Sequence, residues 1–170
     1  MPRRPTHAAA VTPATAALTR SGEPFTAHPF DSVAGAVSYG AEAAAQLAPA
    51  LGVQPQQVFK TLIVQVDATL VVALLPVTRS LSLKALASAA GGKRAKLATA
   101  ADAERATGYV IGGISPLGQR RRLPTYLDSS AREHATVLVS GGRRGLDLQL
   151  TPDTLIRLTD AVLVAIAQSS

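Results

Sequence analysis

The sequence predicts one domain of the mixed α/β or α+β class rather than a doubly wound parallel sheet. Two β-branched runs follow each other closely enough to form a hairpin, and alanine-rich helical segments lie between the strand-like runs. Of the 170 residues, 47% are hydrophobic and 16% are charged, which is enough apolar material for one buried core. We expect a flexible tail over residues 1–11 and a single domain over residues 12–170.

The first elements follow from capping residues and prolines. Thr12 is an N-cap residue followed by Pro13, so a helix should begin there and end near Gly22. The next stretch, "FTAHPF", is expected to be extended. Pro29 limits it to a sheet edge or a turn, because proline has no N–H to donate.

A helix and a hairpin are predicted next. The stretch "YGAEAAAQLAPALGV" indicates a helix, with Pro49 ending or kinking it and Gly52 marking its stop. The runs "VFKTLIVQV" and "TLVVALLP" are separated by Asp67 and Ala68, which predicts a hairpin. Because both runs are almost continuously apolar, we expect both faces of these strands to be covered.

Short helices and strands continue to the end of the chain. "SLSLKALASAA" predicts a helix that stops at Gly91, "KRAKLAT" predicts a short strand, and Thr99 caps a further helix. "RLPTYLD" and "ATVLVSGG" are typical of strands, with "SSAREH" as a capped turn between them. "GLDLQL" alternates and predicts a half-buried strand. Thr151 opens a last helix, and "AVLVAIA" fits a helix or a strand equally well.

The composition excludes several kinds of chemistry. Cysteine is absent, which excludes disulfides, thiol catalysis by the protein and thiolate metal sites. His7, His28 and His134 lack the spacing of metal ligands, so we predict neither a metal nor another cofactor. No apolar run is long enough to cross a bilayer, and no secretory-type segment follows Arg3 and Arg4. The sequence therefore predicts a cytoplasmic protein without a membrane partner.

The net charge of +6 is concentrated in short clusters beside glycines. The clusters are Lys93, Arg94 and Lys96; Arg120, Arg121 and Arg122; and Arg143 and Arg144. One such cluster is usually only solvated surface. Several of the same sign on loops favour a polyanionic partner, because phosphates attract them whatever the base sequence. A membrane surface is disfavoured, because these residues do not lie along one amphipathic helix.

The glycine-rich stretch "GYVIGGISPLG", residues 108–118, does not fit the common ligand-binding or catalytic loops. It lacks the ending of a phosphate loop and the spacing of a dinucleotide-binding loop. Gly113 and Gly118 flank Ser115 with one residue too many for a nucleophile elbow. We therefore interpret Ser115 as a turn hydroxyl. The stretch is either a connecting turn or a pocket lined by backbone N–H groups.

Two further segments carry candidate functional side chains. Lys60 lies at the start of a predicted strand, with Thr61 on the opposite face, and is either a solvent-facing lysine or a cation held at a cleft. In "VSGGRRGLDLQL", a hairpin would bring Ser140 and Asp147 close together. A hairpin with glycine and arginine at its tip is also an ordinary connection, and the residues alone leave both interpretations open.

Together, "VFKTLIVQV", "TGYVIGGISPLGQRRRLPTYLD" and "VSGGRRGLDLQL" resemble the YbaK-type aminoacyl-tRNA deacylases, which are related to the editing domain of bacterial prolyl-tRNA synthetases. The resemblance covers residues 12–167. It implies a central mixed, barrel-like sheet with surrounding helices, and the hydrolysis of a mischarged aminoacyl-tRNA. "GGISPLG" followed by basic residues and "LPT" is similar to the Cys-tRNA(Pro) deacylase branch. The implied partners are tRNA(Pro) and, as a further candidate, prolyl-tRNA synthetase.

The resemblance also implies roles for individual residues. Lys60 aligns with the lysine that the family needs for activity, and Gly112 and Asp147 are expected to act with it. The expected substrate-binding residues are Phe30, Tyr39, Thr61, Gly113 and Ser140. The expected tRNA contacts are Lys93, Arg94, Arg120, Arg121, Arg143 and Arg144. Two features depart from the family pattern: Phe30 stands where tyrosine is common, and the segment from Tyr39 to Lys60 is a few residues longer.

The chain offers no cysteine, elbow serine or partnered histidine, and the resemblance implies that the thiol of the substrate's own cysteine attacks the ester. Backbone N–H groups of Gly112 and Gly113 would then orient the carbonyl. Lys60 would hold the terminal ribose-phosphate or the developing anion, while Ser140 and Asp147 bind the α-amino group. The alternatives are deacylation of Ala- or Ser-tRNA by activated water, an ordinary hydrolase with Asp147 as the base, and a non-catalytic RNA-binding module.

Overall fold

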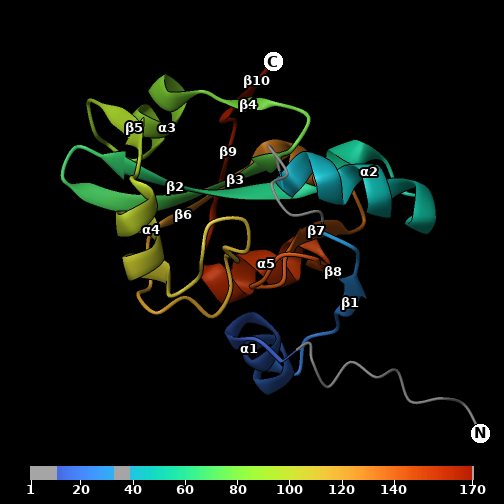
Figure 1. Ribbon diagram of the computed structural model, residues 1–170. Coiled ribbons are helices and arrows are strands. Elements are labelled where there is room, and N and C mark those ends of the chain that lie inside the picture. The colour runs from blue at the N-terminus through green and yellow to red at the C-terminus, as the bar shows by residue number, and fades with distance from the viewer. Residues whose placement is uncertain (1–10, 33–38, 170) are drawn as a thin grey trace, which may run out of the picture.

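The computed structural model describes residues 11–32 and 39–169, and helices and strands are interspersed along this part of the chain (Figure 1). Its α-helices are α1 (Pro13–Ser21), α2 (Tyr39–Leu51), α3 (Leu83–Ala89), α4 (Ala100–Thr107) and α5 (Pro152–Thr159), with 3-10 turns η2 (Pro55–Gln57) and η3 (Ser129–Glu133). Its strands are β1 (Thr26–Pro29), β2 (Phe59–Val66), β3 (Thr69–Pro76), β4 (Ser80–Leu81), β5 (Ala95–Leu97), β6 (Thr125–Asp128), β7 (Val137–Ser140), β8 (Leu146–Leu150), β9 (Val162–Val164) and β10 (Ala167–Gln168). The tail expected over residues 1–11 lies outside the described residues except for Val11.

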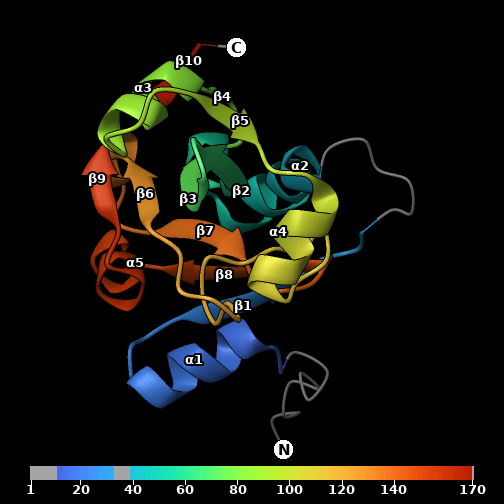
Figure 2. The same cartoon turned by 90° about the vertical axis from the view of Figure 1, so that its left-hand side faces the viewer.

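The strands form mixed sheets around a shared interior (Figure 2). One sheet has the order β5-β2-β3-β6-β9, in which β2 is antiparallel to β3 and β5, while β6 is parallel to β3 and β9. A second sheet, β1-β8-β7, is antiparallel, and a bridge between Val58 and Leu138 links it to the start of β2. The predicted mixed α/β fold with a barrel-like arrangement of strands and surrounding helices is confirmed.

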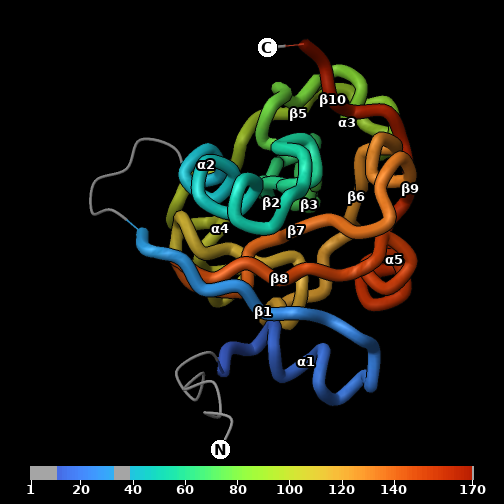
Figure 3. Tube along the Cα trace, turned by 90° about the vertical axis from the view of Figure 1, so that its right-hand side faces the viewer, coloured from blue at the N-terminus to red at the C-terminus, as the bar shows by residue number. Residues whose placement is uncertain are grey.

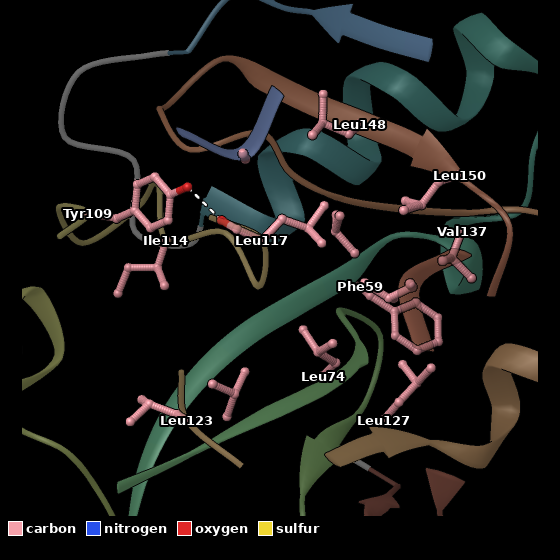
Figure 4. Packing of buried hydrophobic residues seen from close by; sticks show 14 of the residues in the cluster. Phe59, Leu74, Tyr109, Ile114, Leu117, Leu123, Leu127, Val137, Leu148 and Leu150 are labelled. Atoms are coloured by element: carbon pink, nitrogen blue, oxygen red, sulfur yellow. Dashed lines mark hydrogen bonds between the residues drawn. The ribbon is translucent and has the colours of Figure 1, made fainter. Parts of the chain in front are cut away.

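The main hydrophobic core lies between these two sheets (Figure 4). Phe59 and Leu74 face Leu148 across it. On the outer face of the hairpin β2–β3, Val71 and Ala73 pack against Leu86 of α3. The prediction that both faces of this hairpin are covered is therefore confirmed.

Helices α1 and α2 lie on opposite sides of the β1-β8-β7 sheet (Figures 1 and 3). Leu47 of α2 packs against Leu138 on one face, and Leu18 of α1 belongs to the main core on the other. Both faces of β8 are thereby covered. The prediction of a half-buried β8 is wrong, since four of its five residues are buried.

Most predicted elements form where expected. Thr12 caps α1 with a capping box, and Gly22 ends the helix in the left-handed conformation. Pro49 neither ends α2 nor removes its last turn; the helix continues to Leu51 and stops at Gly52. The helix expected in "SLSLKALASAA" begins only after Ser82, because Ser80–Leu81 pairs with β10 instead. Such pairing joins residues far apart in the sequence, which a local pattern does not reveal.

A buried carboxylate fixes the C-terminal segment to the sheet. Oδ1 of Asp128 accepts hydrogen bonds from the N–H groups of Ile166 and Ala167, both at 2.9 Å. Oδ2 accepts from the N–H and the hydroxyl of Ser130. Burial alone would raise the pKa of Asp128, but the hydrogen bonds from Ser130, Ile166 and Ala167 outweigh it and lower that pKa.

Replacing Asp128 with asparagine is expected to reduce the free energy of unfolding by about 2–3 kcal/mol, because a charged acceptor of several bonds is lost. The lowered pKa means that the stability from Asp128 is present above about pH 4 and disappears as the pH falls through the folded-state value. Urea unfolding of both proteins between pH 3 and 7 would measure this. Equal stability at pH 7 would contradict the role given to Asp128.

Candidate active site

A cavity of about 350 Å³ opens where α2, β2, the glycine loop and the β7–β8 hairpin meet. Its lining includes the following residues that the sequence singled out: Phe30, Tyr39, Lys60, Thr61, Gly112, Ser140 and Asp147. These residues come from five separate stretches of the chain, and only the tertiary fold brings them together. Gly113 is the expected substrate-binding residue that the cavity does not include.

Lys60 extends from β2 and is half-buried at the cavity. Its Nζ donates a hydrogen bond to the carbonyl oxygen of Arg79 at 2.7 Å. An ammonium group has three donors, so this bond fixes the side chain and leaves donors for a ligand. Burial lowers the pKa of Lys60. Beside it, the Oγ1 atom of Thr61 is buried and has no hydrogen-bond partner among the described residues.

Asp147 lines the cavity and is only 6% exposed. The register of the β7–β8 hairpin places it directly opposite Ser140, as the hairpin interpretation expected. On its other side it is opposite His28 of β1. Burial raises the pKa of Asp147 to about 7. A carboxyl group of this kind can bind an ammonium group or exchange a proton near neutral pH.

The glycine loop is a folded unit rather than a loose connection. The hydroxyl of Tyr109 donates to the carbonyl oxygen of Leu117 at 2.6 Å and closes the loop (Figure 4). Burial raises the pKa of Tyr109 to about 12, so the hydroxyl stays protonated as a donor. Oγ of Ser115 accepts from the N–H of Leu117 at 3.2 Å. The interpretation of Ser115 as a turn hydroxyl agrees with this geometry.

The two adjacent glycines of this loop have different surroundings. Gly112 faces the cavity, whereas the N–H of Gly113 donates to the carbonyl oxygen of Val110 at 2.9 Å. A Cβ at Gly113 would lie 2.7 Å from the Cα of Arg143, so this glycine permits two backbones to touch. Of the two N–H groups expected to meet the substrate, that of Gly113 already has an acceptor within the loop, and that of Gly112 stays the predicted donor.

The start of helix α1 contacts both the glycine loop and the turn between β7 and β8. The hydroxyl of Thr12 donates to the carbonyl oxygen of Gly141 at 2.5 Å. A Cβ at Gly118 would lie 2.4 Å from the carbonyl oxygen of Pro13, so the end of the glycine loop packs directly on the start of α1. Through these contacts α1 supports both the glycine loop and the turn between β7 and β8.

The basic clusters separate into different parts of the molecule. Arg143 and Arg144 line the cavity itself. Arg121 lies in a different surface groove, which also contains Arg105 of α4. Lys93 and Arg94 follow α3, where their N–H groups donate to the carboxylate of Asp67. Arg120 packs against Gly108 at the end of α4.

Sequence reasoning did not identify every residue of the cavity. Glu42, in the first turn of α2, and the apolar side chains of Leu97 and Ile111 also line it. Glu42 lies one helical turn after Tyr39, so the helix prediction could have placed it on the same face. No spacing in the sequence indicates that Leu97 and Ile111 line the cavity. They are exposed apolar residues beside the cavity.

Within residues 11–32 and 39–169, no helix has the length and apolar character needed to cross a membrane. The same residues contain no group of three or more histidine, cysteine, aspartate or glutamate side chains that could hold a metal ion.

The fold is that of a class of proteins that edit aminoacyl-tRNA. The aminoacyl-tRNA editing domain matches residues 39–158, and the chain belongs to this family. More particularly, the chain is 38% identical over 118 residues to EbsC of Enterococcus faecalis, a proposed Cys-tRNA(Pro)/Cys-tRNA(Cys) deacylase. This match covers 69% of the chain and 72% of EbsC.

Solved structures agree with this assignment. A proposed trans-editing enzyme for prolyl-tRNA synthetase superposes with a TM-score of 0.79 at 25% identity, over 92% of this chain and 96% of that one. The hypothetical protein APE2540 has the same TM-score at 23% identity, over 92% of this chain and 100% of its own, and shows the fold. The predicted resemblance to the YbaK-type editing proteins is confirmed.

Proposed function

We propose that this protein is a trans-editing enzyme that deacylates Cys-tRNA(Pro). One observation carries the proposal. The cavity combines the ammonium group of Lys60, the buried carboxyl group of Asp147 and the backbone of Gly112, and its described lining residues include no histidine or cysteine that could act as a nucleophile or activate a hydroxyl group. Such a site can position an ester and stabilise charge, yet it supplies no activated protein nucleophile. The likeness to EbsC and to the trans-editing enzyme supports this substrate class.

The missing nucleophile would come from the substrate. The sulfur of the esterified cysteine forms a bond to its own carbonyl carbon, and the bond from that carbon to the ribose oxygen breaks. The ribose oxygen takes up the proton that the thiol gives, so tRNA leaves with a free hydroxyl. The other product is a four-membered thiolactone, which water opens to free cysteine. Holding sulfur and carbonyl carbon in contact is the main task of the cavity.

The residues of the cavity suit these steps. The N–H of Gly112, for which no partner is found among the described residues, would meet the carbonyl oxygen as negative charge develops. Lys60 would stabilise the leaving ribose oxygen or the adjoining phosphate. Asp147 and Ser140 would receive the α-amino group, whose positive charge favours the ionised carboxyl.

A second candidate function rests on Asp147. A carboxyl group whose pKa is about 7 could take a proton from water, which would allow deacylation of Ala- or Ser-tRNA on the same fold. In either case the partner would be tRNA(Pro) in the cytoplasm, with prolyl-tRNA synthetase as a further candidate partner suggested by the structural likeness.

Deacylation of tRNA(Pro) charged with cysteine, serine or alanine separates the two functions. We expect Cys-tRNA(Pro) to be cleaved on the order of 100-fold faster than Ser-tRNA(Pro), because a thiol is a far better nucleophile at neutral pH than an alcohol of the same shape. Rates would be measured with and without Asp147→Asn. Equal rates on cysteine and serine esters, together with loss of both in Asp147→Asn, would favour activated water instead.

A further inference from the structure

The turn between β7 and β8 carries two arginines that line the cavity. Arg143 and Arg144 both line it, and the Nε atom of Arg143 is buried without a hydrogen-bond partner among the described residues. A buried guanidinium N–H normally has an acceptor, because leaving it unpaired costs free energy. Nη1 of the same guanidinium donates to the carbonyl oxygen of Arg144 at 3.2 Å. Nε is therefore the donor of Arg143 that residues 11–32 and 39–169 leave without an acceptor.

The second arginine is held in a defined position. The Cζ atom of Arg144 lies 4.3 Å from the centre of the Tyr39 ring, in cation–π contact. A Cβ at Gly112 would lie 2.8 Å from this ring and 2.9 Å from Nε of Arg144, so the glycine makes room for the stack. A guanidinium held over a ring in this way still has N–H donors in its own plane that can bind an anion.

The charge of the cavity agrees with an anionic ligand. Lys60, Arg143 and Arg144 are the cationic side chains in its lining, and Glu42 and Asp147 are the acidic ones. The first turn of α2, which carries Tyr39 and Gly40, also faces the cavity and adds the positive end of a helix dipole. An aminoacyl ester alone carries no negative charge, and the anion that develops during its cleavage is assigned to Lys60, so neither accounts for the two arginines.

We propose that Arg143 and Arg144 form a phosphate subsite at the rim of the cavity. It binds the phosphodiester group that precedes the esterified terminal nucleoside, and Tyr39 is a positioning residue that holds Arg144 in place. This assignment rests on the proposed function in that the ligand is the 3′ end of a tRNA. It places at the terminal nucleotide the two arginines that the sequence analysis expected only as tRNA contacts.

Binding of adenosine 5′-monophosphate and of adenosine, without any aminoacyl group, tests the subsite. We expect the monophosphate to bind the wild-type protein about tenfold more tightly at low salt, and the difference to shrink as salt screens the charges. Arg144→Gln should reduce the preference severalfold, and the double change with Arg143→Gln should abolish it. Titrations followed by calorimetry or by the amide signal of Gly112 would report both affinities.

Matched variants separate the subsite from general charge effects. Arg121→Gln removes the same charge outside the cavity and should keep the tenfold preference. Tyr39→Phe retains the ring and should also keep it, whereas Tyr39→Leu should lose part of it. Equal affinity of the wild-type protein for both nucleosides, or an unchanged preference in the double variant, would overturn the proposal.

The same measurements distinguish failure of the subsite from failure of the proposed function. A protein that prefers the monophosphate but never cleaves Cys-tRNA(Pro) would keep the subsite and refute the deacylase. A protein that cleaves Cys-tRNA(Pro) with no preference for the monophosphate would keep the deacylase and refute the subsite.

Discussion

Replacing Lys60 with alanine is expected to lower kcat/KM for Cys-tRNA(Pro) about 100-fold or more while the protein remains folded. The side chain supplies a cation at the cavity, held in place by the carbonyl oxygen of Arg79. Loss of one well-placed donor to a developing anion costs about 100- to 1,000-fold in other enzymes. The loss of one half-exposed hydrogen bond should reduce the free energy of unfolding by only about 1 kcal/mol.

Single-turnover deacylation and thermal unfolding of Lys60→Ala would measure both effects. Lys84→Ala is a matched control, because it removes the same charge from an exposed position on α3 that does not line the cavity. Its rate should equal that of the wild-type protein. A fully active and folded Lys60→Ala variant would exclude Lys60 from the mechanism and leave Gly112 and Asp147 to carry it.

Gly112→Ala is expected to reduce deacylation by a similar factor, about 100-fold, through geometry rather than charge. Gly112 has a φ of +92°, a backbone conformation that an alanine adopts only with strain. The added methyl group would also lie 2.8 Å from the Tyr39 ring and 2.9 Å from Nε of Arg144. The ring, the arginine or the loop must move, and a displacement of about 1 Å at a reacting site can cost about 100-fold in rate.

Gly91→Ala provides the matched control for this change. Gly91 has a φ of +73°, but no neighbouring atom lies within 4 Å of the position that the methyl group would take, so its substitution adds backbone strain without a steric clash. Backbone strain should cost each variant about 1 kcal/mol of stability, to which the clash adds in Gly112→Ala, and only Gly112→Ala should lose activity. Wild-type activity in Gly112→Ala would show that neither the loop position nor the stack with Tyr39 matters to the reaction.

The sequence predicted those parts of the site that depend on local pattern. The hairpin β2–β3 follows from two β-branched runs separated by two residues. The pairing of Ser140 with Asp147 follows from two strand-like runs joined by a glycine-containing turn. The resemblance supplied Lys60 and Gly112 in the same way, because each lies in a continuous recognisable stretch.

Other features depend on how distant segments pack, and no local pattern contains them. Asp147 is buried on the face of β8 that the alternation assigned to solvent, where residues of α2 line the same cavity. Arg143 and Arg144 were expected only as tRNA contacts on a loop, yet Gly113 allows their turn to approach the glycine loop and line the cavity. Adjacent glycines in both segments were the one available signal of this close approach.

The contacts of α1 have a consequence for moving this activity into other proteins. Residues 39–158 match the editing domain, but Thr12 and Pro13 lie before them and contact both loops of the cavity. A transplanted module bounded at Tyr39 would leave behind the support on which its arginine turn and glycine loop rest. A fragment that is to keep this activity in another protein therefore has to be longer than residues 39–158 and has to include helix α1.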